Sequence, residues 1–106
     1  MATIKLRKWD VAEHLKTEED MALYLEACLE EAGDDASFIA KVLGDIARAK
    51  GMTQLARDTG LGRESLYKAL SGAGNPSFAT ILKVMNALGL QFHATQRRAH
   101  TEIVVR

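Results

Sequence analysis

The chain has 106 residues, of which 47% are hydrophobic and 26% charged, and its formal net charge at pH 7 is zero. This length and composition predict one domain with a modest hydrophobic core. The single cysteine, Cys28, excludes an internal disulfide, and no apolar run reaches the length of a signal peptide or a membrane span. We therefore expect a protein of the reducing cytoplasm with no membrane partner.

The charges are distributed unevenly along the chain. Residues 1–35 carry ten acidic and four basic residues, whereas residues 36–106 carry ten basic and four acidic residues. Such asymmetry is typical of a chain with one part that binds a polyanion and an acidic part with another role. The alternative is that the acidic part is simply a solvated helix face.

An acidic helix is predicted after a short N-terminal arm. The arm, "TIKLRKW", alternates apolar and basic residues and is expected to be extended. Thr17 is a suitable N-cap for the helix, because acidic residues follow it in the first turn, and Gly33 is expected to end the helix. The apolar stripe expected to face the core comprises Met21, Tyr24, Leu25, Cys28 and Ala32.

A second helix is predicted to begin at Asp34 or Asp35 and to end at the "AKG" of residues 49–51. Its inner stripe is Ile39, Val42, Leu43 and Ile46. Two short helices are predicted next, in "TQLARDTG" (53–60) and "GRESLYKALSG" (62–72). Gly60 is expected to adopt the left-handed backbone of the turn between them, with Gly62 as the next N-cap.

The last predicted helix begins at Ser77, after the loop "GAGNP", and ends at Gly89. Its periodic apolar residues are Phe78, Ile81, Leu82, Met85 and Leu88. Beyond it, "LQFHATQ" (90–96) and "EIVVR" (102–106) are predicted to form short strands.

The two short helices and the turn "TGLG" follow the pattern of a helix-turn-helix. Their apolar residues must face one core, so the outward residues of the second helix cannot be buried. A DNA major groove about 12 Å wide admits such a helix, with Arg63 suited to guanine, Glu64 to cytosine, and Lys68 to a base edge or a phosphate. Phosphate contacts are expected near the starts of the neighbouring helices. The predicted DNA-binding residues are Thr53, Gln54, Arg63, Glu64, Ser65, Tyr67, Lys68, Asn75 and Ser77. The alternative is an ordinary surface helix in a helical bundle.

Residues 36–90 resemble the five-helix domain of the lambda-repressor-like (Xre/Cro) family, with "TQLARDTGLGRESLYKALSG" as its helix-turn-helix and "NPSFATILKVMNALGL" as its fourth helix. More narrowly, these segments and "WDVAEHLKTEEDMALYLEACLEEA" resemble HigA-like antitoxins of the addiction-module antidote family. The resemblance covers roughly residues 9–92. It implies a dimeric DNA-binding antitoxin that represses its own operon and neutralises a RelE/HigB-like toxin, usually an mRNA endonuclease.

The acidic N-terminal half is the predicted toxin surface, because RNA-binding nucleases are basic and an acidic surface steers toward them. The predicted toxin-binding residues are Trp9, Glu18, Glu19, Tyr24, Glu26 and Glu30. Alternatively, the acidic face is only solvated and Trp9 only covers the core. A homodimer is expected because a single domain reads few base pairs. Its interface is expected at "LGLQF" or "EIVVR", unless Leu90 and Phe92 simply complete the core.

The combined prediction is an all-α, lambda-repressor-like helix-turn-helix domain with an N-terminal helical extension and a short C-terminal extended segment. Its parts are an acidic arm and helix (1–35), the DNA-binding domain (36–90) and an extended tail (91–106). The three histidines lack metal-ligand spacing with Cys28 or with one another, and no nucleotide-binding fingerprint occurs, so we expect no enzyme activity, metal or cofactor. The alternatives are an Xre-family transcriptional regulator without a toxin partner and a helical adaptor that does not bind DNA.

Overall fold

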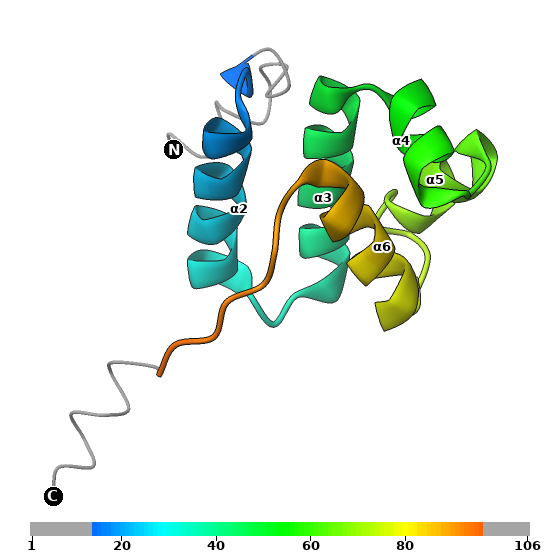
Figure 1. Ribbon diagram of the computed structural model, residues 1–106. Coiled ribbons are helices and arrows are strands. Elements are labelled where there is room, and N and C mark those ends of the chain that lie inside the picture. The colour runs from blue at the N-terminus through cyan, green and yellow to red at the C-terminus, as the bar shows by residue number, and fades with distance from the viewer. Residues whose placement is uncertain (1–13, 97–106) are drawn as a thin grey trace, which may run out of the picture.

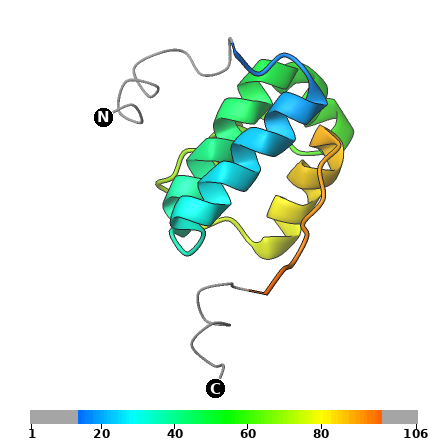
Figure 2. The ribbon, with the colours of Figure 1, turned by 90° about the vertical axis from the view of Figure 1, so that its left-hand side faces the viewer.

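A computed structural model of the chain describes residues 14–96, and within this range the protein consists of five α-helices and no β-strand. The helices are α2 (Glu18–Ala32), α3 (Ala36–Lys50), α4 (Met52–Thr59), α5 (Arg63–Ala69) and α6 (Phe78–Leu88). Helices α2 and α3 lie side by side and antiparallel, and the three shorter helices lie beyond α3 (Figure 1, Figure 2). The prediction of an all-α fold is therefore confirmed for this part of the chain.

Three of the helices, α2, α3 and α6, begin with side-chain N-caps at residues that the sequence predicts. Thr17 and Asp20 form a capping box, in which the Asp20 N–H donates to Thr17 Oγ1 at 3.0 Å and the Thr17 N–H donates to the Asp20 carboxylate at 3.2 Å. Asp35 accepts from the Phe38 N–H at 3.1 Å, and Ser77 accepts from the Thr80 N–H at 3.1 Å. Each cap satisfies a backbone donor that the first turn of a helix leaves without a partner.

The turn between α4 and α5 has the backbone conformation predicted from its glycine. Gly60 has a φ of 78°, in the left-handed region, and its N–H donates to the Ala56 carbonyl at 3.0 Å. Thr59 Oγ1 donates to the Leu55 carbonyl at 2.8 Å and accepts from the Leu61 N–H at 3.2 Å. These bonds satisfy the polar groups of the turn locally, so its geometry is fixed by α4 itself.

A single hydrophobic core joins all five helices of residues 14–96. Of the predicted inward residues of α2 to α5, it contains Met21, Leu25, Val42, Leu43, Ile46, Leu55, Leu66 and Leu70. Four others are only partly buried against it, namely Tyr24, Cys28, Ile39 and Ala56, and Ala32 is not part of it. The largest of its fully buried side chains are Leu43, Ile46, Leu55, Leu66, Met85, Leu88, Val42 and Val84. Between residues 14 and 96, none of the helices has the length and apolar content needed to cross a lipid bilayer.

Glycine at position 44 allows the end of α5 to lie directly on α3. A Cβ atom added to Gly44 would lie only 2.8 Å from the carbonyl oxygen of Leu70, the C-cap of α5. The side chain of Leu70 is itself buried in the core. The position of α5 is thus fixed at its C-terminal end by contact with α3 and at its N-terminal end by the turn from α4.

The periodic apolar residues of α6 are not all buried. Phe78 is 67% exposed and Leu82 is 41% exposed, whereas Val84, which is not among the periodic residues, is fully buried. Eight of the eleven residues of α6 are apolar, so the spacing is compatible with more than one buried face. Packing against α3 and α4 selects the face with Val84, Met85 and Leu88.

The prediction of a strand at residues 90–96 is wrong. Within residues 14–96 no other extended segment pairs with it, so its backbone cannot form a ladder. The alternation instead places Leu90 in the core, with its N–H bonded to the Met85 carbonyl at 2.9 Å, and Phe92 at the surface. The predicted arm "TIKLRKW", Trp9 and the predicted strand "EIVVR" lie outside the described residues.

We predict that Gly60→Ala lowers the free energy of unfolding by about 1–2 kcal/mol, because a β-carbon disfavours the left-handed backbone. No atom lies within 4 Å of the added Cβ position, so this cost reports backbone conformation and not a clash. Gly60→Asn is the matched control, since asparagine tolerates this conformation better, and it should lose less stability in urea unfolding. Equal losses in the two variants would contradict the explanation.

Candidate nucleic-acid interface

The seven-residue helix α5 is held to the core by one edge and presents the rest of its surface to solvent. Leu66 is fully buried and Leu70, which ends the helix, is 5% exposed. The residues between and before these anchors are exposed, namely Arg63, Glu64, Ser65, Tyr67 and Lys68. The predicted outward face of α5 is therefore a real surface of the monomer, at the side farthest from α2 (Figure 1).

Arg63 and Tyr67 lie one turn apart on α5 and contact each other. A terminal nitrogen of Arg63 donates to Tyr67 Oη at 3.3 Å, and the Arg63 guanidinium carbon lies 5.8 Å from the centroid of the tyrosine ring. Such a pair restricts the arginine through both a hydrogen bond and a cation–π contact. Because a guanidinium has five N–H donors, this contact leaves most of them for another partner.

Glu64 and Lys68 also lie one turn apart on this face. In the part of the chain that the structure describes, neither side chain forms an ion pair. Both are exposed, so their charges are hydrated and available to a ligand. The exposed face of α5 thus combines two cations, one carboxylate, a hydroxyl and a phenol.

The remaining residues predicted to contact DNA are exposed at the starts of α4 and α6. Thr53 and Gln54 lie in the first turn of α4, where the Gln54 side-chain amide donates to the Asp58 carboxylate at 2.9 Å. Asn75 and Ser77 precede α6, and the Ser77 hydroxyl is already engaged as its N-cap. At Ser77, therefore, the backbone rather than the side chain is available to a ligand.

The loop after α5 is packed against the first turns of α3. Gly72 has a φ of 87°, and a Cβ atom added there would lie 2.7 Å from the Lys41 side chain and 3.2 Å from the Ser37 carbonyl oxygen. Ser71 Oγ donates to the Lys68 carbonyl at 3.0 Å and accepts from the Ala73 N–H at 3.1 Å. The glycine-rich loop therefore holds the start of α6 in a defined place relative to α5.

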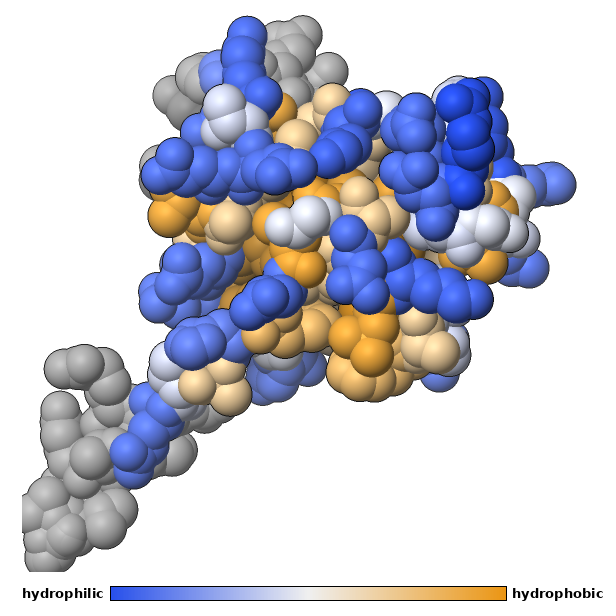
Figure 3. All heavy atoms as spheres, viewed as in Figure 1, coloured by the Kyte–Doolittle hydropathy of each residue, from blue (hydrophilic) through white to orange (hydrophobic). Residues whose placement is uncertain are grey.

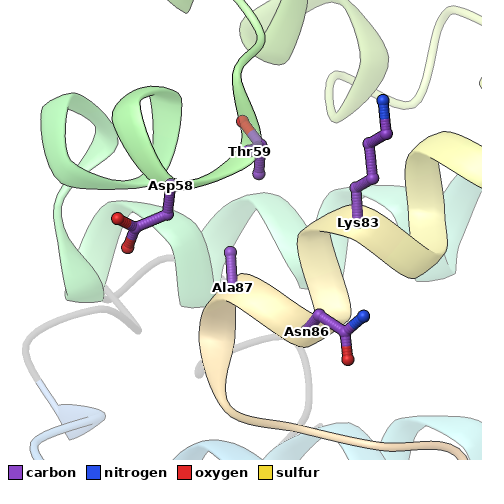
Figure 4. Close-up of a pocket in the computed structure, with 5 residues that line it drawn as sticks. All are labelled: Asp58, Thr59, Lys83, Asn86 and Ala87. Atoms are coloured by element: carbon purple, nitrogen blue, oxygen red, sulfur yellow. The ribbon is translucent and has the colours of Figure 1, made fainter.

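An open hollow lies between the end of α4 and the second half of α6 (Figure 4). It is lined by Asp58, Thr59, Lys83, Asn86 and Ala87. One carboxylate and one ammonium give it no preference for an anion or a cation. Sequence reasoning did not select these residues, although Lys83 is the single charged residue of α6. Within residues 14–96, no three His, Cys, Asp or Glu side chains lie together so as to hold a metal ion.

Apart from Trp9, which lies outside the described residues, the residues predicted to bind a toxin lie on α2 and divide into two groups. Glu18 and Tyr24 connect α2 to α3, since Glu18 forms an ion pair with Lys50 at 3.0 Å and the Tyr24 hydroxyl donates to the Asp45 carboxylate at 2.9 Å. Glu19, Glu26 and Glu30 are exposed. Glu18 is also exposed, so what distinguishes these last three carboxylates is that none of them forms an ion pair among the described residues.

Comparison with known proteins gives one family and one relative. The family model described as "Probable addiction module antidote protein" matches residues 5–96. An uncharacterized protein of Haemophilus influenzae strain Rd is 57% identical over 96 residues, which cover 91% of this chain and 97% of the relative. No solved structure matches the chain.

We predict that Arg63→Ala and Lys68→Ala each change the free energy of unfolding by less than about 0.5 kcal/mol, because both side chains are exposed. Leu66→Ala should cost about 2–5 kcal/mol, because Leu66 is fully buried. Urea unfolding of the three variants measures this contrast. A loss of more than about 1 kcal/mol in Arg63→Ala would mean that its side chain supports the fold.

Proposed function

The chain belongs to the family of probable addiction module antidote proteins, and from this membership we propose that it is the DNA-binding antitoxin of a type II toxin–antitoxin system. In this proposal α4, the turn at Gly60 and α5 act as a helix-turn-helix of the lambda-repressor-like (Xre/Cro) kind. The protein represses its own operon as a homodimer and neutralises a RelE/HigB-like mRNA nuclease. Membership of an antidote family supports a protein that acts by binding a toxin. It therefore favours an antitoxin over a transcriptional regulator without a toxin partner.

The observation that carries DNA binding is the exposed face of α5. A helix that enters the major groove reads base edges with side chains near its start. Arg63 has the donors for a bidentate contact to guanine, Glu64 can accept from the cytosine amino group, and Lys68 reaches a base edge or a phosphate. Ser65 and Tyr67 add hydrogen-bonding groups that suit either bases or backbone.

Phosphate contacts are supplied by the helices on either side of α5. The first turn of α6 contains no acidic residue that would compete with a phosphate for its backbone N–H groups. Asn75 and Ser77 are exposed at this end, and Thr53 and Gln54 are exposed at the start of α4. These groups position the protein on the duplex, while the outer face of α5 reads the sequence.

The toxin-binding surface is the acidic outer face of α2. The sequence of α2 contains no basic residue, and among the described residues its one ion pair joins Glu18 to Lys50. Glu19, Glu26 and Glu30 therefore present uncompensated negative charge to solvent. A toxin that binds RNA carries a basic surface, and complementary charge accelerates its capture by the antitoxin.

We predict that the protein binds the DNA upstream of its own gene with a steep salt dependence, because phosphate contacts release counterions. Arg63→Ala should weaken this binding by about 1–3 kcal/mol and relax its sequence preference, because a base contact is lost. Lys16→Ala, which removes an exposed cation before α2, is the matched control and should leave binding nearly unchanged. Fluorescence anisotropy with the upstream DNA and a scrambled duplex measures both effects. Equal affinity for the two duplexes would contradict operator recognition.

We predict that the double substitution of Glu26→Lys and Glu30→Lys weakens binding to the small basic protein encoded beside this gene, because attraction is replaced by repulsion. Co-expression and pull-down, followed by titration calorimetry, measure the loss. Asp58→Lys is a charge-reversal control on α4, which lies on the other side of α3 from α2 (Figure 1). Retained binding in the double variant would remove α2 from the toxin interface.

A further inference from the structure

Three large apolar side chains remain exposed on and beside α6. Phe78 is 67% exposed, Leu82 is 41% exposed and Phe92 is 42% exposed. Phe78 and Leu82 lie one turn apart on the helix, and the ring of Phe92 stacks on that of Phe78 with centroids 6.2 Å apart. We refer to these three residues as the α6 patch; apolar surface over this part of the molecule is visible in Figure 3.

The α6 patch is held in place by the core beneath it. Leu90 is buried, and its N–H bond to the Met85 carbonyl turns the chain back beside α6. This anchor brings Phe92 to Phe78, so the stacked pair is ordered before any partner arrives. An ordered aromatic surface loses little conformational entropy when it is covered.

The chemistry around the α6 patch distinguishes between possible partners. Residues 75–96 contain no Asp or Glu, and their only Lys or Arg is Lys83. This segment itself therefore offers no carboxylate to a basic toxin and little positive charge to DNA. An uncharged apolar patch is complementary to another uncharged apolar patch, and a second copy of the same chain supplies one through a two-fold axis.

We propose that the α6 patch is the surface through which two copies of this chain meet, with Phe78, Leu82 and Phe92 at the centre of the contact. Dimerisation itself does not depend on DNA. Its use rests on the proposed function, because two copies of α5 would then face the two half-sites of a palindromic operator.

The size of the α6 patch sets the strength expected of this dimer. A fully accessible aromatic side chain has an area of about 200 Å², and that of leucine is slightly smaller. Multiplied by the exposed fractions of Phe78, Leu82 and Phe92, these areas give an exposed apolar surface on the order of 300 Å². A patch of this size on a monomer is often functional, but a standard interface buries about 800 Å² on each partner. The patch is thus the centre of a small interface, and we expect a dissociation constant in roughly the micromolar range.

Sedimentation equilibrium of the full chain over a wide concentration range tests the proposal. We expect a monomer–dimer equilibrium. Leu82→Glu and Phe78→Glu should each raise the dissociation constant of the dimer at least about tenfold, because each substitution buries a charge in the contact. Leu23→Glu is the matched control, because Leu23 is an exposed leucine (58%) on α2, and it should dimerise like the wild-type chain. Glu at position 78 suits the start of a helix, so unchanged thermal unfolding is expected for that variant.

Two outcomes would overturn the proposal. The first is a full chain that stays monomeric at every concentration, and the second is a dimer that both α6 variants leave intact.

Binding to a palindromic duplex and to a single half-site separates this proposal from DNA recognition. Leu82→Glu, which lies outside the first turn of α6, should lose affinity for the palindrome but keep half-site binding, while Arg63→Ala should remain dimeric and bind both duplexes more weakly. If the wild-type chain forms a dimer that depends on the α6 patch but binds neither duplex, the proposal of DNA recognition is contradicted and the proposal about the dimer contact is not.

Discussion

The function proposed for this protein depends on how two leucines anchor α5. Leu66 and Leu70 bury one edge of a seven-residue helix in the core, and Gly44 lets the end of that helix approach the α3 backbone. A helix this short is not stable alone in water, so its position comes from packing and not from its own hydrogen bonds. Because this edge and the partly buried Ala69 make the contacts of α5 with the core, the polar side chains of α5 remain at the surface.

The described part of the molecule divides its surface among three helices with different chemistry. The outer face of α2 is acidic, that of α5 is mixed but carries Arg63 and Lys68, and that of α6 is apolar at Phe78 and Leu82. The uneven charge of the sequence is thus a spatial separation, with α3 between α2 and α5 (Figure 1). This arrangement allows a basic protein and a nucleic acid to bind without competing for one surface.

The sequence predicted most of the helices because their ends carry strong local signals. Thr17, Asp35 and Ser77 act through side-chain caps, and Gly60 through a left-handed backbone, all of which are properties of a few adjacent residues. The apolar periodicity of α6 did not identify its buried face, because eight of its eleven residues are apolar and the spacing alone does not reveal which side meets α3 and α4. The prediction of a strand at residues 90–96 was wrong for a different reason, because alternation of apolar and polar residues does not show whether a partner strand exists.

At the candidate site, the sequence predicted which side chains of α5 are exposed, because buried leucines spaced four apart leave the others outside. It did not predict the contact between Arg63 and Tyr67, which depends on side-chain conformation, or the stacking of Phe78 on Phe92, which depends on the turn after α6. Spacing along one helix can be read from a sequence, whereas contacts between separate segments come from the folded chain.

The most direct test of DNA recognition by α5 is an NMR titration of the 11.6 kDa chain with DNA from upstream of its gene. The amide chemical shifts of residues 63–68 and of the starts of α4 and α6 should change most, while those of Glu19, Glu26 and Glu30 on α2 should stay in place. Changes concentrated on α2, with residues 63–68 unaffected, would contradict the account.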